Sequence, residues 1–186
     1  MKRFLDLIVS GSAFILLLPV FLIIAVAVKL TSPGPVFHVS DRVGQGNRIF
    51  RMFKFRTMCV NTPHVATHLM TDPEKYLTPI GGFLRKTSLD EFPQLLNVLK
   101  GDMSFVGPRP ALFNQDDLIK LRTEKGVHCL VPGITGWAQI NGRDELPIPV
   151  KVEFDEYYLK KKGVLLDLKI LFFTPFKVLS KDGVAH

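Results

Sequence analysis

The chain has few cysteines from which a disulfide framework could be built, and it has no dinucleotide-binding glycine fingerprint. Only two cysteines, Cys59 and Cys129, occur in 186 residues, and they show no Cys-x-x-Cys spacing. This usage is typical of free thiols in a reducing compartment, although an even pair leaves one disulfide open. Gly44 and Gly46 do not begin a G-x-G-x-x-G fingerprint, because position 49 is Ile49.

A complete zinc-binding cluster is also missing. His64 and His68 are four residues apart, which on a helix is a spacing that can bind zinc. No third ligand is evident, and Pro63 and Pro73 flank the pair. We therefore expect residues 61–75 to form a mobile loop, which could close over a site.

Acidic residues are fewer than basic ones, 17 against 24, which gives a net charge of +7. Nucleic acid, anionic lipid headgroups and phosphorylated substrates are the partners that such a charge attracts. Hydrophobic residues make up 47% of the chain, and the first thirty positions supply much of the excess. No later run reaches the ~18 apolar residues that a further membrane span needs. Beside one membrane segment, lipid and phosphate are favoured over nucleic acid.

The apolar run from Leu7 to Val28 is interrupted by Pro19. As one straight helix it would be about 33 Å long, enough to span a bilayer once. Pro19 would kink such a helix, and each half would then cover about half the membrane thickness, so that the segment enters and leaves by the same face. Lys2-Arg3 at one end and Lys29 at the other satisfy the positive-inside bias in this re-entrant arrangement. A signal peptide is the third arrangement that the residues leave open.

Residues 36–39 and 48–56 are expected to be extended, with a turn at 44–47. On an extended strand Lys54 and Arg56 share one face. Together with Arg48 and Arg51 they form either an anion site or a solvated strand edge.

Apolar residues recur at helical spacing from Leu89 to Leu99, and Gly101 supplies a stop. Ser88 and Glu91 fit a capping box, but Pro93 would then lie beyond the first turn. We therefore expect Asp90 and Glu91 at the helix entrance, in or just before its first turn, where the helix dipole favours ionised carboxylates and also attracts phosphate.

Several further expectations concern the second half of the chain. Between Pro108 and Pro110, Arg109 is held on a stiff backbone, which suits either a fixed contact to phosphate or an exposed turn. Residues 134–140 look like a strand, followed by a hairpin turn at 141–142. Residues 151–162 are expected to be helical, and 164–179 to form two short pieces separated at Pro175. The aromatic residues of this last segment are expected either at a membrane interface or in a core helix, and they are Phe172, Phe173 and Phe176.

Several long motifs occur in a characteristic order. They are Ser32-Pro33-Gly34-Pro35, Lys54-Phe55-Arg56-Thr57-Met58, Arg85-Lys86-Thr87-Ser88-Leu89-Asp90-Glu91, Pro93 to Ser104, Gly107-Pro108-Arg109-Pro110 and Pro132 to Gln139. By these motifs the chain resembles the small monotopic bacterial phosphoglycosyl transferases, also called the bacterial sugar transferase family. The resemblance covers nearly the whole chain.

The resemblance implies an α+β, mostly helical fold. Residues 1–31 would form a re-entrant membrane helix-break-helix, and residues 32–186 a small catalytic domain with short β-hairpins and interfacial amphipathic helices. This domain would lie on the cytoplasmic face of the bacterial inner membrane. The implied reaction transfers a sugar 1-phosphate from a UDP-sugar to polyprenyl phosphate, releases UMP and requires Mg2+, as the first membrane step of glycoconjugate assembly.

Residue by residue, the resemblance makes Asp90 the nucleophile and Glu91 its partner, with both carboxylates available to Mg2+. The remaining site residues are on the substrate side. They are Lys54, Arg56, Arg85 and Arg109, which would lie at the phosphates, and Pro108, Gln139 and Arg143. Two positions depart from the family pattern: Leu18 precedes Pro19 where many members have Ser, and Val131 stands where a basic residue is common.

The sequence does not fix the sugar, the lipid length, the carboxylate that touches the metal, or whether the chain forms an oligomer. A non-catalytic, basic membrane adaptor that binds anionic lipid is the alternative function. Nucleic-acid binding rests on charge alone and has no recognition motif here.

Overall fold

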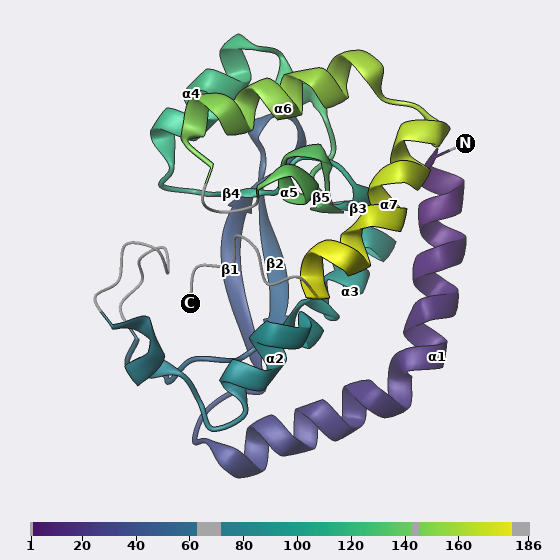
Figure 1. Cartoon of the computed structure of the whole chain (residues 1–186). Helices are drawn as coiled ribbons and strands as arrows, with labels where there is room; N and C mark the ends of the chain where they lie inside the picture. Colours follow the sequence, from purple (N-terminus) through teal and green to yellow (C-terminus); the bar gives the residue numbers. More distant parts are fainter. Residues whose placement is uncertain (1, 63–71, 143–145, 180–186) are drawn as a thin grey trace.

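The secondary structure is mostly helical, with two small sheets (Figure 1), which confirms the expected α+β class. The computed structural model describes residues 2–62, 72–142 and 146–179. The helices are α1 (Lys2–Thr31), α2 (Gly81–Thr87), α3 (Gln94–Lys100), α4 (Asp116–Glu124), α5 (Trp137–Asn141), α6 (Ile148–Lys161) and α7 (Val164–Leu179). The strands are β1 (Phe37–Val43), β2 (Ile49–Phe55), β3 (Ser104–Val106), β4 (Ala111–Leu112) and β5 (Gly133–Thr135). Short 3-10 turns are η1 (Gln45–Asn47), η3 (Pro73–Tyr76), η4 (Leu89–Glu91) and η5 (Val127–Cys129).

Helix α1 contains the apolar run and is long and apolar enough, by length and composition, to cross a membrane. Figure 1 shows it bent about midway along its length. Pro19 lies inside the helix and cannot donate a hydrogen bond to the carbonyl of Ile15, which is the usual cause of such a bend.

The first turns of α1 are attached to the rest of the chain by polar contacts. Lys2 forms an ion pair of 2.9 Å with Asp167 of α7. The guanidinium of Arg3 donates hydrogen bonds to carbonyls at the C-terminal end of α3. Asp6 is buried and accepts a hydrogen bond of 3.1 Å from the hydroxyl of Ser104 in β3. Three separate elements therefore hold this end of the helix.

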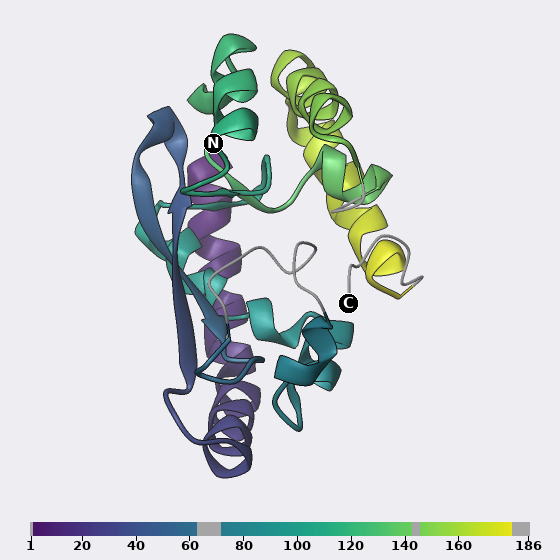
Figure 2. The same ribbon diagram turned by 90° about the vertical axis from the view of Figure 1, so that its left-hand side faces the viewer.

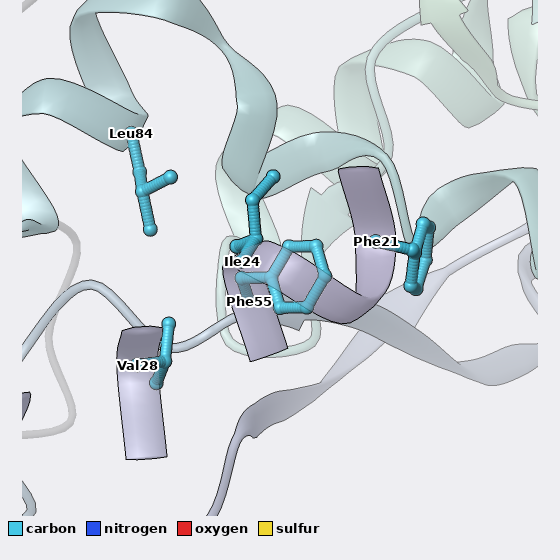
Figure 3. Packing of buried hydrophobic residues seen from close by; sticks show 5 residues of the cluster. All are labelled: Phe21, Ile24, Val28, Phe55 and Leu84. Carbon is cyan, nitrogen blue, oxygen red and sulfur yellow. The ribbon is translucent and has the colours of Figure 1, made fainter. Parts of the chain in front are cut away.

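The second half of α1 is attached by apolar packing instead. Figure 3 shows Phe21, Ile24 and Val28 facing Phe55 of β2 and Leu84 of α2. The rings of Phe21 and Phe55 have centroids 4.9 Å apart. Burying each of these side chains contributes about 1.5–3 kcal/mol, so this half of α1 forms part of the core of the domain.

Strands β1 and β2 form an antiparallel hairpin, in register from Phe37 opposite Phe55 to Val43 opposite Ile49. The turn between them is η1, which confirms the expected turn. Strand β4 pairs with the far edge of β1, and β3 pairs in parallel with β5. In Figure 2 the hairpin and α1 lie on one side of the molecule, and α6 and α7 lie on the other.

The strand expected at 134–140 is wrong beyond residue 135. Strand β5 ends at Thr135, and α5 follows from Trp137 to Asn141. The expected hairpin turn is wrong too, because Gly142 caps the end of a helix. The reason is tertiary packing: Ile140 is buried against Tyr158 of α6 and Ile170 of α7, and the helical conformation brings it there.

The expected break at Pro175 is also wrong, since α7 continues through it to Leu179. Two features hold the helix next to the proline. The hydroxyl of Thr174 lies 2.8 Å from that of Thr135, and the side chain of Ile170 is fully buried in the core. Three aromatic side chains of α7 are exposed and contact one another, namely Phe172, Phe173 and Phe176. Exposure favours the membrane-interface interpretation over the core helix. The helix expected at 151–162 is confirmed as α6.

A buried ion pair joins α4 to α6 and generates a stability prediction. Arg122 donates two hydrogen bonds to Asp155, at 2.7 and 3.0 Å, and Asp155 is 1% exposed. Arg122→Met leaves this carboxylate buried without its partner, so we expect a loss of about 3–5 kcal/mol of unfolding free energy near neutral pH. Chemical denaturation in detergent measures it.

The loss caused by Arg122→Met should shrink as the pH falls. Burial already raises the pKa of Asp155, and Arg122 lowers it, so removing Arg122 raises the pKa further. A raised folded-state pKa gives stability that is complete below the ordinary carboxyl pKa and is lost as the pH rises. A deficit equal at about pH 5 and about pH 8 would contradict the assignment. The double variant Arg122→Met/Asp155→Leu should recover most of the loss.

Candidate functional site

The two adjacent carboxylates lie in η4, the short turn directly before α3. Ser88, between α2 and η4, has a left-handed backbone with φ of 56°, unusual for a residue other than glycine. Its side chain caps neither helix, so the capping box is not formed. The expected place of Asp90 and Glu91 just before the first turn of the helix is confirmed.

Glu91 joins two cations that come from distant parts of the chain. Its Oε1 atom lies 2.7 Å from Nζ of Lys54 at the end of β2. The same oxygen lies 3.5 Å from a guanidinium nitrogen of Arg109. The side chains of Lys54 and Glu91 are only 17% and 18% exposed, whereas that of Arg109 is 39% exposed. Little solvent screens the ion pair of Lys54 and Glu91, whereas Arg109 is the more exposed of the two cations.

Asp90 differs from Glu91 in its surroundings. It is 7% exposed, and among residues 2–62, 72–142 and 146–179 no group donates a hydrogen bond to its carboxylate. Burial raises the pKa of Asp90 to about 6, and the negative charge of Glu91 adds to the rise, while Lys54, Arg85 and Arg109 lower it. The carboxylate is therefore mainly ionised at neutral pH, and none of the described residues donates a hydrogen bond to it. A buried carboxyl with a shifted pKa beside several charged groups is a candidate functional residue.

Arg85 approaches the same carboxylate from the end of α2. Burial lowers the pKa of its guanidinium, and the negative charge of Asp90 raises it. Its Nε atom donates a hydrogen bond of 3.1 Å to the hydroxyl of Thr57. Thr57 thus orients Arg85. It was not among the expected site residues, although it stands in the motif that begins at Lys54.

The residues present suit a magnesium ion that is shared with a phosphorylated substrate. In the part of the chain that the structure describes, no group of three or more His, Cys, Asp or Glu side chains could hold a metal by itself. Mg2+ is commonly bound by one or two carboxylates together with substrate phosphates. Asp90 and Glu91 offer the two carboxylates, and no described residue donates a competing hydrogen bond to Asp90.

Arg56 lies away from these carboxylates. It is 5% exposed, and its guanidinium donates hydrogen bonds to the carbonyls of Pro35, at 2.6 Å, and Ser32, at 2.9 Å. Both carbonyls belong to the segment that follows α1. Arg56 thus ties the segment that follows α1 to the end of β2, and its expected place at the phosphates stays a prediction.

The other substrate-side residues have different surroundings. The carbonyl of Pro108 accepts a hydrogen bond of 2.9 Å from the amide of Gly133, which fixes the backbone next to Arg109. Gln139 is 8% exposed, and neither atom of its amide has a partner within the described ranges. Arg143, like His64 and His68, lies outside the described residues.

The geometry is that of an anion site with a reactive carboxylate. Lys54, Arg85 and Arg109 converge on Asp90 and Glu91, and each comes from a different element. Such a site can bind a diphosphate and hold one carboxylate oxygen towards phosphorus.

Comparisons with known proteins agree with the motifs. The sequence model of the family described as bacterial sugar transferase matches residues 1–181. The uncharacterized sugar transferase EpsL of Bacillus subtilis is 43% identical over 99% of this chain and 90% of its own length. A UDP-N-acetylgalactosamine-undecaprenyl-phosphate N-acetylgalactosaminephosphotransferase of Aeromonas hydrophila is 40% identical over 98% of this chain. A UDP-glucose:undecaprenyl-phosphate glucose-1-phosphate transferase of Escherichia coli is 41% identical over 95% of it.

The chain belongs to the bacterial sugar transferase family, which confirms the resemblance. It spans 44% of the length of the Aeromonas relative and 40% of that of the Escherichia relative.

The two hydrogen bonds of Arg56 to the segment after α1 predict that this side chain stabilises the fold. Arg56→Met removes two charge-assisted hydrogen bonds at the end of α1, so we expect the unfolding free energy to fall by about 2 kcal/mol or more. Arg51→Met, an exposed position on the same strand, is the matched control and should change it by no more than about 0.5 kcal/mol. Denaturation of both variants in detergent measures the difference, and equal stabilities would show that the two carbonyl contacts contribute nothing.

Proposed function

We propose that the chain transfers a sugar 1-phosphate from a UDP-sugar to polyprenyl phosphate and releases UMP. The observation that carries the proposal is the pairing of two unlike carboxylates. Asp90 is buried and receives no hydrogen bond from the part of the chain that the structure describes, while Glu91 is fixed by Lys54 and Arg109. The family membership supports it, and the names of the Aeromonas and Escherichia relatives describe this reaction with two different sugars.

In the first step an oxygen of Asp90 attacks the phosphorus next to the sugar. The bond from this phosphorus to the bridging oxygen breaks, and UMP leaves with the electron pair. The product on the enzyme is an acyl phosphate that carries the sugar. With a pKa of about 6, Asp90 is mainly ionised at neutral pH and needs no separate base.

In the second step an oxygen of polyprenyl phosphate attacks the same phosphorus, and the Asp90 carboxylate leaves. The lipid then carries the sugar on a diphosphate. Each product departs before the next substrate reacts, so the kinetics are ping-pong.

Charge repulsion is the main obstacle, because an anion must approach a diphosphate. Lys54, Arg85 and Arg109 supply fixed positive charge around Asp90. Asp90 and Glu91 would hold Mg2+, which when bound offsets the charge of the phosphates. Glu91 keeps Lys54 in place through the 2.7 Å contact, and therefore acts on Asp90 through that lysine.

A re-entrant path for α1 is part of the same proposal. The polar contacts of Lys2, Arg3 and Asp6 attach one end of α1 to the domain, and Phe21 and Val28 attach the other half. A helix with both ends on one domain cannot leave them on opposite faces of a bilayer. A shallow insertion would keep Asp90 at the headgroup level, where polyprenyl phosphate presents its phosphate.

The covalent step generates a direct prediction. Asp90→Asn removes the attacking oxygen's charge, so we expect UMP release to fall by a factor of about 10³ or more while the chain stays folded. The assay screens UDP-glucose, UDP-galactose and UDP-N-acetylgalactosamine with undecaprenyl phosphate, with and without Mg2+. Mass spectrometry of wild-type chain quenched with donor alone should find the sugar phosphate on Asp90.

Asp116→Asn, an acid-to-amide change at an exposed position in the first turn of α4, is the control and should keep the activity within a few-fold. UMP release by Asp90→Asn at the wild-type rate would overturn the nucleophile assignment. Lipid binding without UMP release from any donor would instead favour the adaptor function.

The path of α1 can be tested with single cysteines at Phe4 and Thr31, in a background in which Cys59 and Cys129 are replaced by Ser. Both positions are exposed and lie at opposite ends of the helix. A membrane-impermeant maleimide should label both in inside-out vesicles and neither in spheroplasts. Labelling of one end from each side would mean that α1 spans the bilayer.

A further inference from the structure

Asn97 is fully buried in α3 and makes an unusual set of contacts with a strand. Its side-chain nitrogen donates a hydrogen bond of 2.7 Å to the carbonyl of Arg51, and its side-chain oxygen accepts one of 3.1 Å from the amide of Phe53. Both peptide groups belong to β2. The side chain of Asn97 therefore pairs with β2 through one donor and one acceptor, as a neighbouring strand would.

The place of β2 in the sheet explains why this matters. Strand β2 is at an edge, because the sheet order is β2-β1-β4, and its outer side is covered by α3. The amide of Phe53 and the carbonyl of Arg51 would lose their partners there without Asn97. Few polar side chains can satisfy a donor and an acceptor at once in this spacing, and Asn is one of them.

These two elements also carry the two halves of the site. Phe53 immediately precedes Lys54 on β2, and Glu91 lies just before α3, the helix that contains Asn97. The segment around α3 therefore contacts β2 at two places: through the Lys54–Glu91 ion pair of 2.7 Å and through the side-chain amide of Asn97. A shift of α3 along β2 would separate Lys54 from Glu91 and change the charge around Asp90.

We propose that Asn97 is a positioning residue that sets the register between β2 and α3, and thereby holds Lys54 against Glu91 beside Asp90. The proposal rests on the proposed function for its kinetic consequence, but its structural consequence stands alone. Asn97 touches neither substrate nor Asp90. It acts through the backbone of β2.

A stabilising role alone is the competing explanation, since any buried amide with two partners contributes to folding. The two explanations differ in what happens to molecules that remain folded. Positioning predicts a lower turnover number in the folded variant, because an error of about 1 Å in a catalytic group is enough to slow a reaction about 10²-fold. Stability alone predicts normal turnover per folded molecule.

The kinetic test compares Asn97→Ala with Leu118→Ala, using the full chain in detergent. Leu118 is buried between α4 and α6, away from β2 and α3, and controls for a general loss of stability. We expect Asn97→Ala to lower kcat about tenfold or more, with KM for the UDP-sugar within about threefold of wild type. Should Asn97→Ala match Leu118→Ala in kcat per folded molecule, positioning is refuted. Asn97→Ser, which keeps one hydrogen-bonding group, replaces it if the alanine variant does not fold, and is judged by the same comparison.

A second measurement does not need turnover. Reductive methylation followed by mass spectrometry reports how accessible Nζ of Lys54 is, and Glu91→Gln gives the reactivity of an unpaired Lys54. Asn97→Ala should raise the labelling of Lys54 about threefold or more, towards that reference, while Leu118→Ala should not. Unchanged labelling in Asn97→Ala overturns the proposal. If the wild type releases no UMP from any UDP-sugar, the proposed function fails, and the labelling result still decides the role of Asn97.

Discussion

The rest of the structure depends on the burial of one face of α1 against β2 and α2. Phe55 and Leu84, which contact this face, each stand next to a site residue: Phe55 follows Lys54, and Leu84 precedes Arg85. The same two backbone segments therefore carry apolar side chains towards the membrane helix and cations towards Asp90. Because a core at close-packed density deforms little, the depth of α1 and the position of the site cannot change independently. The long apolar helix thus serves as part of the scaffold of the candidate site.

The charges in this fold fall into two classes that burial treats differently. Arg122 and Asp155 are buried together and satisfied, and they hold α4 to α6. Asp90 is also buried, but within the described ranges it meets the charges of Lys54, Arg85 and Arg109 and no hydrogen-bond donor. Burying an ionised carboxylate is costly unless cations offset it, so the three cations make an ionised Asp90 compatible with folding. Under the proposed function the same three cations would also meet the diphosphate of the substrate, so they would serve both folding and substrate binding.

Local patterns predicted the parts of the fold that local forces determine. The apolar run, the turn at 44–47 and the helix that ends at Gly101 were all predicted, because each depends on neighbouring residues. The strand expected at 134–140 was wrong because Ile140 packs on α6 and α7, which no local pattern reveals. The site was predicted through motifs, yet alternation along β2 put Arg56 beside Lys54. The amide of Arg56 still donates a hydrogen bond to Val36, but its guanidinium contacts the segment that follows α1, and alternation along a strand does not reveal such a tertiary contact.

The bend of α1 shows how tertiary contacts replace a local device. The resemblance noted in the motifs led us to expect a serine before the proline, whose hydroxyl could satisfy a backbone group freed by the kink. This chain has Leu18 there. The bend is instead supported by aromatic contacts: Phe14 and Phe21, on either side of Pro19, have ring centroids 5.6 Å apart, and Phe21 packs on Phe55. With each half of the helix held by the domain, the proline needs only to remove one hydrogen bond, and the domain determines the direction in which the helix turns. The geometry of the membrane segment is therefore a property of the whole chain.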